Sequence, residues 1–354
     1  MRILATIAVL SVLAYPVLFG PVLAQPADLD ALMPGLLKAQ NVPSIAVAEI
    51  TDGRIVFAKA YGEQSPGVPA TEGTLYNLAS LSKPITAEVI LRMASDGKLT
   101  LDESMAATYA DPDVADDPRT PLLTLRIALA HLTGFPNWRD GKLAYRFTPG
   151  SDYGYSGEGY LYALHFAAAK AKTPFVDMAQ HYVLGPAGMK DTALVKQAWF
   201  VGRVAVPTDS DGHALTPQFT DQPLAADLVY ATIGDYARFV VSAMSHQGLS
   251  DDLALQRRSR QFDNTKKSCE GLPVCPDAIG PGLGWETIRI GMQTYMMHTG
   301  SDAGVSTFVY WNPDSKTGAV ILTNSDNGDK VRLAVLDALG QDKPFVDLLH
   351  KVET

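Results

Sequence analysis

Strand-like sequence lies near both ends of this chain, and helix-like sequence occupies its middle. Residues 44–50 and 54–61 are β-rich runs joined by Asp52-Gly53, a strong signal for a two-residue hairpin. Four further strand patterns, separated by turn residues, come near the end, at 284–290, 293–298, 305–311 and 319–324. We therefore expect the two ends of the chain to share one sheet.

Between these strands the apolar residues recur with helical spacing. Helices are expected over 80–96, 124–132 and 159–172, and an amphipathic segment at 329–339 is expected to pack across the sheet. The predicted fold class is α+β, with an antiparallel sheet built from both chain ends, flanked by helices, and a mainly helical lobe inserted between them.

This pattern divides the chain into two lobes of one domain. Residues 25–79 and 225–354 are expected to form the α/β lobe, and residues 80–224 the helical lobe. A cleft between two such lobes is the natural place for a ligand site.

The amino terminus has the pattern of a secretory signal peptide. Arg2 supplies positive charge, an apolar run covers 3–18, and Val22-Leu23-Ala24 is a small-residue cleavage signal. An uncleaved membrane anchor is the alternative, but Pro16 interrupts the apolar run. We expect a signal peptide of residues 1–24, a periplasmic or secreted protein, and no stable membrane insertion after cleavage.

The charge balance constrains the partners. The formal net charge is −9, which argues against nucleic acid or an anionic membrane surface, because both call for basic patches. A small-molecule or short peptide substrate is expected instead, and the sequence carries no signal for an oligomeric state.

Cys269 and Cys275 are the only cysteines. In an exported protein, two closely spaced thiols usually pair, so a local disulfide is expected. Two thiols are too few for a structural zinc site, and no H-E-x-x-H accompanies them, so no metal is expected. The surrounding segment 250–282 lacks clear periodicity and is either a lid or a solvated surface loop.

Ser80-Leu81-Ser82-Lys83 places a hydroxyl and an amine three residues apart, on one face of a helix. Pro84 fits a helix beginning near Ser80, because the first four N–H groups lack intrahelical partners. It also disfavours helical backbone at Lys83. The positive end of a helix favours a serine alkoxide and lowers the pKa of a buried lysine. One S-x-x-K is weak evidence by itself.

Two more motifs follow in order. The first, Pro149 to Gly157, contains Tyr155, and the second is His298-Thr299-Gly300-Ser301 at the end of an expected strand. Together the three resemble the class C β-lactamase family, with its related esterases, D-aminopeptidases and DD-peptidases, whose pattern is S-x-x-K, Y-x-N, then K-T-G or H-T-G. The segment from His131 to Phe135 is similar to a structural H-T-S-G segment of that family.

The resemblance implies a β-lactamase/penicillin-binding-protein-like fold and a role for each matching residue. It makes Ser80 the nucleophile, Lys83 its base partner and Tyr155 a second proton relay. It also implies that the backbone N–H groups of Ser80 and Ser301 form the oxyanion hole. The strand that faces the substrate would contain His298, Thr299 and Gly300. An acyl-enzyme forms and is hydrolysed without a metal or organic cofactor. His131 is interpreted as structural, hydrogen-bonded near a helix end.

Two departures from the family pattern bear on the substrate. Gly157 stands where the family often has Asn, and His298 where penicillin-active enzymes have Lys. A neutral imidazole binds a carboxylate less firmly than an ammonium does, which argues against potent β-lactamase activity.

We therefore predict an exported serine hydrolase that cleaves small esters or D-amino-acid peptide or amide bonds. The alternatives are a β-lactamase or D-alanyl-D-alanine carboxypeptidase that binds penicillin, and, from a different class, a non-catalytic homologue that binds peptidoglycan or a partner.

Three other motif matches are interpreted as incidental. Lys316-Thr317-Gly318 is a literal K-T-G, but the preceding Asn312-Pro313-Asp314 predicts a hairpin turn there. Ser325-Asp326-Asn327 matches an S-D-N but follows the third motif, so a turn is expected. The run from Gly154 to Glu158 approaches G-x-S-x-G but ends in Glu rather than Gly.

Overall fold

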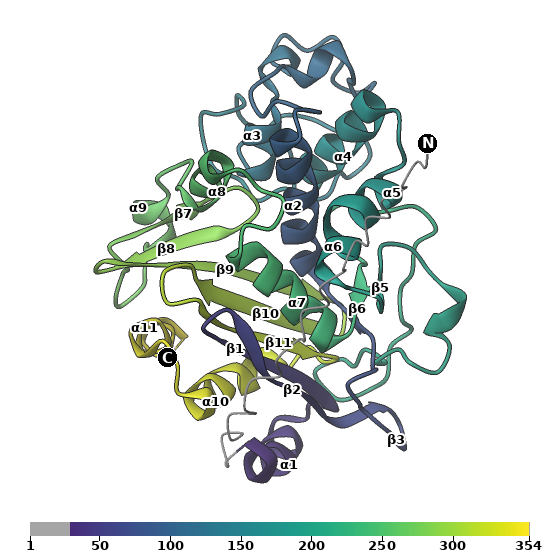
Figure 1. Cartoon of the computed structure of the whole chain (residues 1–354), viewed down its shortest axis with the longest axis vertical. Helices are drawn as coiled ribbons and strands as arrows, with labels where there is room; N and C mark the ends of the chain where they lie inside the picture. Colours follow the sequence, from purple (N-terminus) through teal and green to yellow (C-terminus); the bar gives the residue numbers. More distant parts are fainter. Residues whose placement is uncertain (1–28, 354) are drawn as a thin grey trace, which may run out of the picture.

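The two ends of the chain form one sheet, as expected. The computed structural model describes residues 29–353, so the predicted signal peptide of residues 1–24 lies outside the described residues. The eight strands run in the order β3-β2-β1-β11-β10-β9-β8-β7, with every neighbouring pair antiparallel (Figure 1). Their bounds are β1 Ser44–Thr51, β2 Arg54–Ser65, β3 Val68–Pro69, β7 Ala278–Pro281, β8 Glu286–Ile290, β9 Gln293–Asp302, β10 Val305–Asn312 and β11 Thr317–Thr323.

The hairpin between β1 and β2 turns where the sequence indicates. Asp52 and Gly53 both have positive φ, 51° and 69°, as a two-residue turn matched to the twist of the strands requires. β1 then pairs with β11, with Val47 opposite Ile321. This pairing joins the first strand of the chain to the last.

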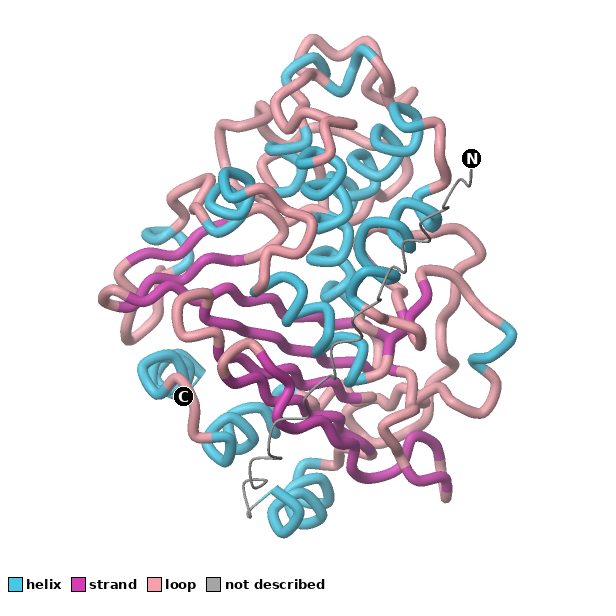
Figure 2. Tube along the Cα trace, viewed as in Figure 1, coloured by secondary structure: helices cyan, strands magenta, loops and turns pink. Residues whose placement is uncertain are grey.

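Helices cover both faces of the sheet, and alternate residues of its central strands are buried against them. Val47, Phe308 and Ile321 belong to one apolar cluster, which includes α1 (Leu29–Gln40), α10 (Asp329–Leu339) and α11 (Lys343–Glu353). Their immediate neighbours in β1, β10 and β11 face the other cluster. On that face α7 (Ile233–Met244) contacts β1, β2 and β11 (Figure 2).

The middle of the chain is largely helical and surrounds α2 (Ser82–Ser95). Twelve of the 14 residues of α2 are buried, so this helix is enclosed by protein on all sides instead of lying on the surface. Around it are α3 Leu125–Leu129, α4 Gly157–Ala171, α5 Phe175–Ala179, a π-helical turn Gln180–Leu184, α6 Gly185–Ala187 and α8 Asp251–Arg258. A small sheet of β4 (Tyr76–Asn77), β6 (Tyr230–Ala231) and β5 (Thr192–Ala193) completes this region.

A buried ion cluster ties α8 to α2. The carboxylate of Glu88 accepts a hydrogen bond from Arg257 at 2.5 Å and lies 3.5 Å from the Arg92 guanidinium. All three side chains are at most 2% exposed. A charge so deeply buried requires its partners, so the cluster fixes the start of the 250–282 segment against the helical core.

The predicted fold class is confirmed, while several boundaries differ. The α-helix expected over 80–96 begins at Ser82, after a 3₁₀ turn η1 (Ala79–Leu81). The helix expected over 124–132 covers only Leu125–Leu129, and that expected over 159–172 begins at Gly157. The segment 329–339 is helical as predicted. The division into 25–79 with 225–354 and 80–224 stays a prediction.

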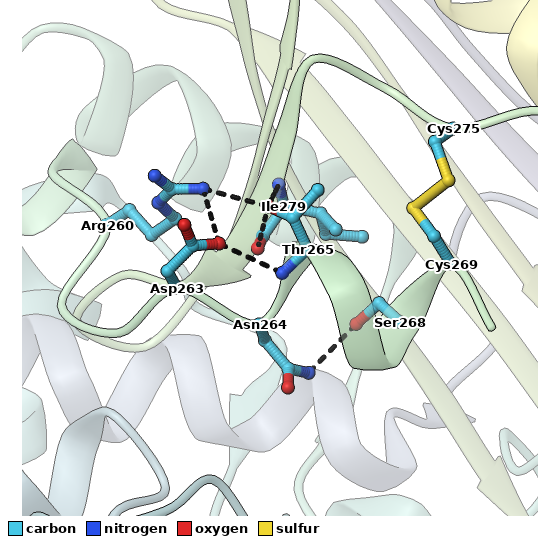
Figure 3. The surroundings of a disulfide bond; sticks show 8 residues. All are labelled: Arg260, Asp263, Asn264, Thr265, Ser268, Cys269, Cys275 and Ile279. Carbon is cyan, nitrogen blue, oxygen red and sulfur yellow. Dashed lines mark hydrogen bonds and ion pairs between the residues drawn. A yellow bond between two sulfur atoms is a disulfide. The ribbon is translucent and has the colours of Figure 1, made fainter.

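The segment 250–282 is more ordered than its sequence indicated. It contains α8, a short helix α9 (Thr265–Ser268) and β7. Cys269 and Cys275 are joined by a disulfide, as predicted (Figure 3). Beside it, Thr265 Oγ1 accepts a hydrogen bond from Ile279 N at 3.0 Å. The stapled loop is therefore bonded to the edge of the sheet.

Two of the three incidental motif matches lie in turns, as expected, and the third, from Gly154 to Glu158, enters α4. Lys316 has φ of 56° in the turn between β10 and β11, and Ser325-Asp326-Asn327 forms the turn before α10. Within residues 29–353, no helix combines the length and apolar character that crossing a membrane requires.

Candidate active site

Ser80 lies on a sharp turn directly before α2. The preceding Ala79 has a left-handed φ of 46°, a conformation that costs a non-glycine residue about 1–3 kcal/mol. Side chains on either side hold it there: Asn77 Oδ1 accepts a hydrogen bond from Ala79 N at 2.9 Å, and Ser82 Oγ donates to Ala79 O at 2.7 Å. The turn presents the Ser80 hydroxyl in a fixed direction.

Lys83 contacts Ser80 from the first turn of α2. Its Nζ donates to Ser80 Oγ at 2.9 Å and to Ala226 O at 3.0 Å, and the side chain is fully buried. Burial lowers the pKa of Lys83 to about 7, while the nearby Asp227 carboxyl acts in the opposite direction. Pro84 does not prevent helical backbone at Lys83. An amine with this pKa is partly neutral at pH 7 and can accept a proton.

Tyr155 completes a group of three side chains. Its phenol lies near the Ser80 side chain, and the interaction between them partly offsets the rise in the Tyr155 pKa caused by burial. Lys83 Nζ lies 4.7 Å from the centroid of the Tyr155 ring. The structure thus brings together the hydroxyl, the amine and the phenol that the sequence singled out, from two segments 72 residues apart between Lys83 and Tyr155.

The ring of His131 packs against the ring of Tyr155. The two rings are stacked with centroids 4.3 Å apart, and His131 Nδ1 accepts a hydrogen bond from Ser156 N at 3.1 Å. Burial, reinforced by the charge of Lys83, holds the His131 pKa well below its usual range, so the imidazole is neutral. The interpretation of His131 as a structural histidine just beyond α3 agrees with these contacts.

Strand β9 forms the opposite wall of the site and extends to Asp302, beyond the residue 298 expected from the sequence. A methyl group on Gly300 would overlap Thr307 Oγ1 and stand 2.7 Å from Leu78 O and 3.0 Å from Ser80 N. Only glycine permits this approach between the strand and the nucleophile turn. The exposed Ser301 follows directly, opposite Ser306 of β10.

His298 and Thr299 line a pocket beside Tyr155. His298 Nδ1–H donates to Thr299 O at 2.7 Å, so its Nε2 carries the free lone pair. Burial and the charge of Lys83 lower the pKa of His298 to about 3. The residue at the position of the family's Lys is therefore an uncharged imidazole.

One acidic residue of this pocket has no counterpart among the sequence predictions. Glu286, the first residue of β8, lines the pocket together with Tyr153, Tyr155 and Trp285. Burial raises the pKa of Glu286 to about 7. No local motif marks this carboxyl, because only the pairing of β8 with β9 brings it to the site.

Gly157, the other departure from the family pattern, lies against a bulky neighbour. A methyl group there would come within 2.8 Å of Asn137 O and 3.0 Å of the Trp138 ring. Asn137 Oδ1 also accepts a hydrogen bond from Gly157 N at 2.9 Å. The space that an Asn side chain would need is filled by residues 137 and 138.

Among residues 29–353, no group of three or more His, Cys, Asp or Glu side chains is placed to hold a metal ion. The chemistry available at this site is that of a hydroxyl nucleophile beside a partly neutral amine and a phenol.

Comparison with known proteins agrees with this arrangement. A family model described as Beta-lactamase matches residues 29–341. The chain belongs to the β-lactamase family. The predicted β-lactamase-related serine hydrolase is confirmed at the level of this family, whose model spans all the candidate site residues.

Other members of the β-lactamase family have different activities by name. The chain is 26% identical to the D-alanyl-D-alanine-carboxypeptidase/endopeptidase AmpH of Escherichia coli over 314 residues, 78% of each chain. It is 32% identical to esterase EstB of Burkholderia gladioli over 116 residues, 32% of this chain and 29% of that protein. A solved class C β-lactamase superposes with a TM-score of 0.72 at 19% identity, covering 88% of this chain and 95% of that one, and this likeness confirms the fold.

The close approach at Gly300 generates a prediction for this β-lactamase-family site. Gly300→Ala is expected to lower kcat/KM for nitrophenyl ester hydrolysis by about 100-fold, because the added methyl moves β9 away from Ser80 and small misplacements of reacting groups have effects of that size. Steady-state kinetics measures the loss, and thermal unfolding confirms that the variant is folded.

The matched control is Gly35→Ala in α1, where a methyl group meets nothing within 4 Å. It is expected to leave kcat/KM unchanged. A folded Gly300→Ala variant with wild-type kinetics would show that the contact between β9 and the Ser80 turn is not needed.

Proposed function

We propose that Ser80 is the nucleophile of an acyl-enzyme mechanism. Its Oγ attacks the substrate carbonyl carbon and passes its proton to Lys83, the amine 2.9 Å away. Tyr155, whose ring centroid lies 4.7 Å from Lys83 Nζ, relays a proton to the leaving group, and the carbonyl–leaving-group bond breaks. The single observation that carries this proposal is the hydrogen bond between the fully buried Lys83 amine and the Ser80 hydroxyl.

The tetrahedral intermediate needs hydrogen-bond donors for its oxyanion. We assign this role to the backbone N–H groups of Ser80 and Ser301. The approach of Gly300 to Ser80 N supports the assignment, because it brings the two chain segments side by side. Water then attacks the acyl carbon, giving its proton to the same Lys83–Tyr155 pair, and Ser80 is released.

Small esters and D-amino-acid peptide or amide bonds are the proposed substrates. The neutral His298 supports this choice, since a penicillin or a peptide carboxylate finds no cation there. The filled space beside Gly157 supports it as well, because no amide side chain can project from that position. The names of AmpH and EstB show that peptide and ester hydrolysis both occur in the family.

Covalent labelling tests the nucleophile. A fluorophosphonate is expected to add to Ser80 in the wild-type protein, with the adduct located by peptide mass spectrometry, and Ser80→Ala is expected to lose it. Ser315→Ala, in the turn with the literal K-T-G, is the matched control and should be labelled like wild type. An adduct that persists in Ser80→Ala, or no adduct in wild type, contradicts the assignment.

The pH dependence of this labelling tests Lys83. Because the pKa of Lys83 is lowered to about 7, its neutral form predominates above that pH, and the labelling rate should fall about tenfold per pH unit below it. The groups facing Lys83 are the Asp227 carboxyl, the Tyr155 phenol and the imidazoles of His131 and His298. A rate independent of pH between 5 and 8 contradicts Lys83 as the base.

Substrate preference is tested by comparing kcat/KM for nitrophenyl esters of short acids, D-alanyl peptides and a chromogenic cephalosporin. Esters or D-peptides are expected to be turned over faster than the cephalosporin, because the pocket lacks a fixed cation for the cephalosporin carboxylate. Cephalosporin turnover that dominates by orders of magnitude would refute the proposed substrate class and favour the β-lactamase alternative.

We also propose that the protein is exported to the periplasm or secreted. The Arg2-initiated apolar amino terminus and the Cys269–Cys275 disulfide support this. When the full chain is expressed in a bacterium with a periplasm, the protein should appear in the periplasmic fraction with the mass of a chain that starts at Gln25. A chain that lacks residues 2–24 should stay in the cytoplasm. A protein of full-length mass in the membrane fraction would instead show that the amino terminus is an uncleaved membrane anchor.

A further inference from the structure

The pocket beside Ser80 contains one carboxyl without a counter-charge. Among residues 29–353, none donates a hydrogen bond to the Glu286 side chain or forms an ion pair with it. Its backbone pairs with Pro281 and Met297, and the residue lines the same pocket as His298. A half-buried carboxylate is unfavourable unless it is paired, so a positively charged group that entered the pocket would be stabilised there.

No basic side chain in the described part of the chain supplies that charge. No Lys or Arg lines the pocket, and its two imidazoles, His131 and His298, are held neutral. Lys267 is the basic residue at the rim, where its Nζ lies 3.3 Å from Tyr153 O and 3.6 Å from an Asp152 carboxylate oxygen. Its side chain is 60% exposed and already paired.

The remaining walls of the pocket suit an organic cation. Tyr153, Tyr155 and Trp285 contribute three aromatic side chains around Glu286. Aromatic faces attract ammonium groups through their quadrupoles, and more strongly where water is excluded. A carboxyl surrounded by aromatic rings therefore favours a protonated amine over a neutral group and disfavours a carboxylate.

Charges on the other side of Ser80 have the same sign. Asp227 follows Ala226, whose carbonyl accepts from Lys83. Asp302 follows Ser301 and accepts a hydrogen bond from Asn77 Nδ2 at 3.0 Å. Neither carboxylate forms an ion pair with a basic side chain in the part of the chain that the structure describes. These two carboxylates therefore add negative charge near Ser80, in addition to that of Glu286.

We propose that Glu286 is the specificity-determining residue of this site and that it selects esters or amides bearing a positively charged ammonium group in the part that occupies the pocket. The inference rests on the proposed function of Ser80. It narrows the substrate class, because substrates whose bound group carries a carboxylate, such as penicillins, are disfavoured by the same residue.

The test compares cationic and neutral substrates of matched shape. One pair carries the charge in the leaving group: acetylthiocholine and 3,3-dimethylbutyl thioacetate. The other pair carries it in the acyl group: the thiobenzyl esters of D-alanine and of isobutyric acid, in which a methyl group replaces the ammonium. Released thiol is measured for all four, and each kcat/KM is divided by the rate constant of hydroxide hydrolysis, so that intrinsic reactivity cancels.

In wild type, the cationic member of at least one pair is expected to exceed its neutral partner by about tenfold or more, as a charge-assisted contact allows. Glu286→Gln should reduce that ratio to within about twofold of one, since the amide keeps the shape but not the charge. The ratio is formed within each variant, so a general loss of activity does not affect it. Glu270→Gln, an exposed acid of the stapled loop, is the matched control and should keep the wild-type ratio.

A wild-type protein that prefers the neutral member of both pairs, or a ratio that Glu286→Gln leaves unchanged, would overturn the inference. Failure of the proposed function is separate, because it shows as absent fluorophosphonate labelling at Ser80. Labelled Ser80 with an unchanged ratio would remove the role of Glu286 alone.

Discussion

The hydrogen bond from Lys83 to Ser80 depends on the removal of water from the amine, and much of the structure serves that burial. α2 is enclosed by protein over most of its length, so the lysine on its first turn cannot reach solvent. Two oxygen atoms, Ser80 Oγ and Ala226 O, accept hydrogen bonds from it. Burial therefore lowers the pKa of the amine. The geometry keeps the amine next to the Ser80 hydroxyl. A surface lysine with the same spacing would stay charged and could not act as a base at neutral pH.

Sequence periodicity predicted the parts of the fold whose signals are local. The Asp52-Gly53 turn and the terminal strands follow from residues close together in the chain, and the structure has them at nearly the expected bounds. The start of α2 differs because Ala79 adopts a left-handed conformation held by Asn77 and Ser82, which no local propensity indicates. Arg257 lies in the segment 250–282, for which a solvated surface loop is one of the two interpretations of the sequence, yet it is buried because Glu88 on α2 pairs with it. Such tertiary partners override local preference.

The same distinction applies to the site. Ser80, Lys83, Tyr155 and Gly300 belong to motifs whose order along the chain identified them before any coordinates, and the structure brings them together. Glu286 belongs to no motif, since its position depends on strand pairing and its raised pKa on burial. The sequence showed that Gly157 departs from the family pattern but not that Trp138 fills the space beside it. The motifs therefore predicted the groups that we propose to react, whereas the groups that we propose to select a substrate became visible only in three dimensions.

The pairing of β1 with β11 has a consequence for the order in which the protein matures. The nucleophile turn is synthesised early, but the strand that faces it, β9, lies more than 200 residues later, and the sheet closes only when β11 has joined β1. Contacts so distant in sequence form slowly. During synthesis Ser80 therefore exists without its opposing wall, and the site is complete only after β9 has been synthesised and has joined the sheet.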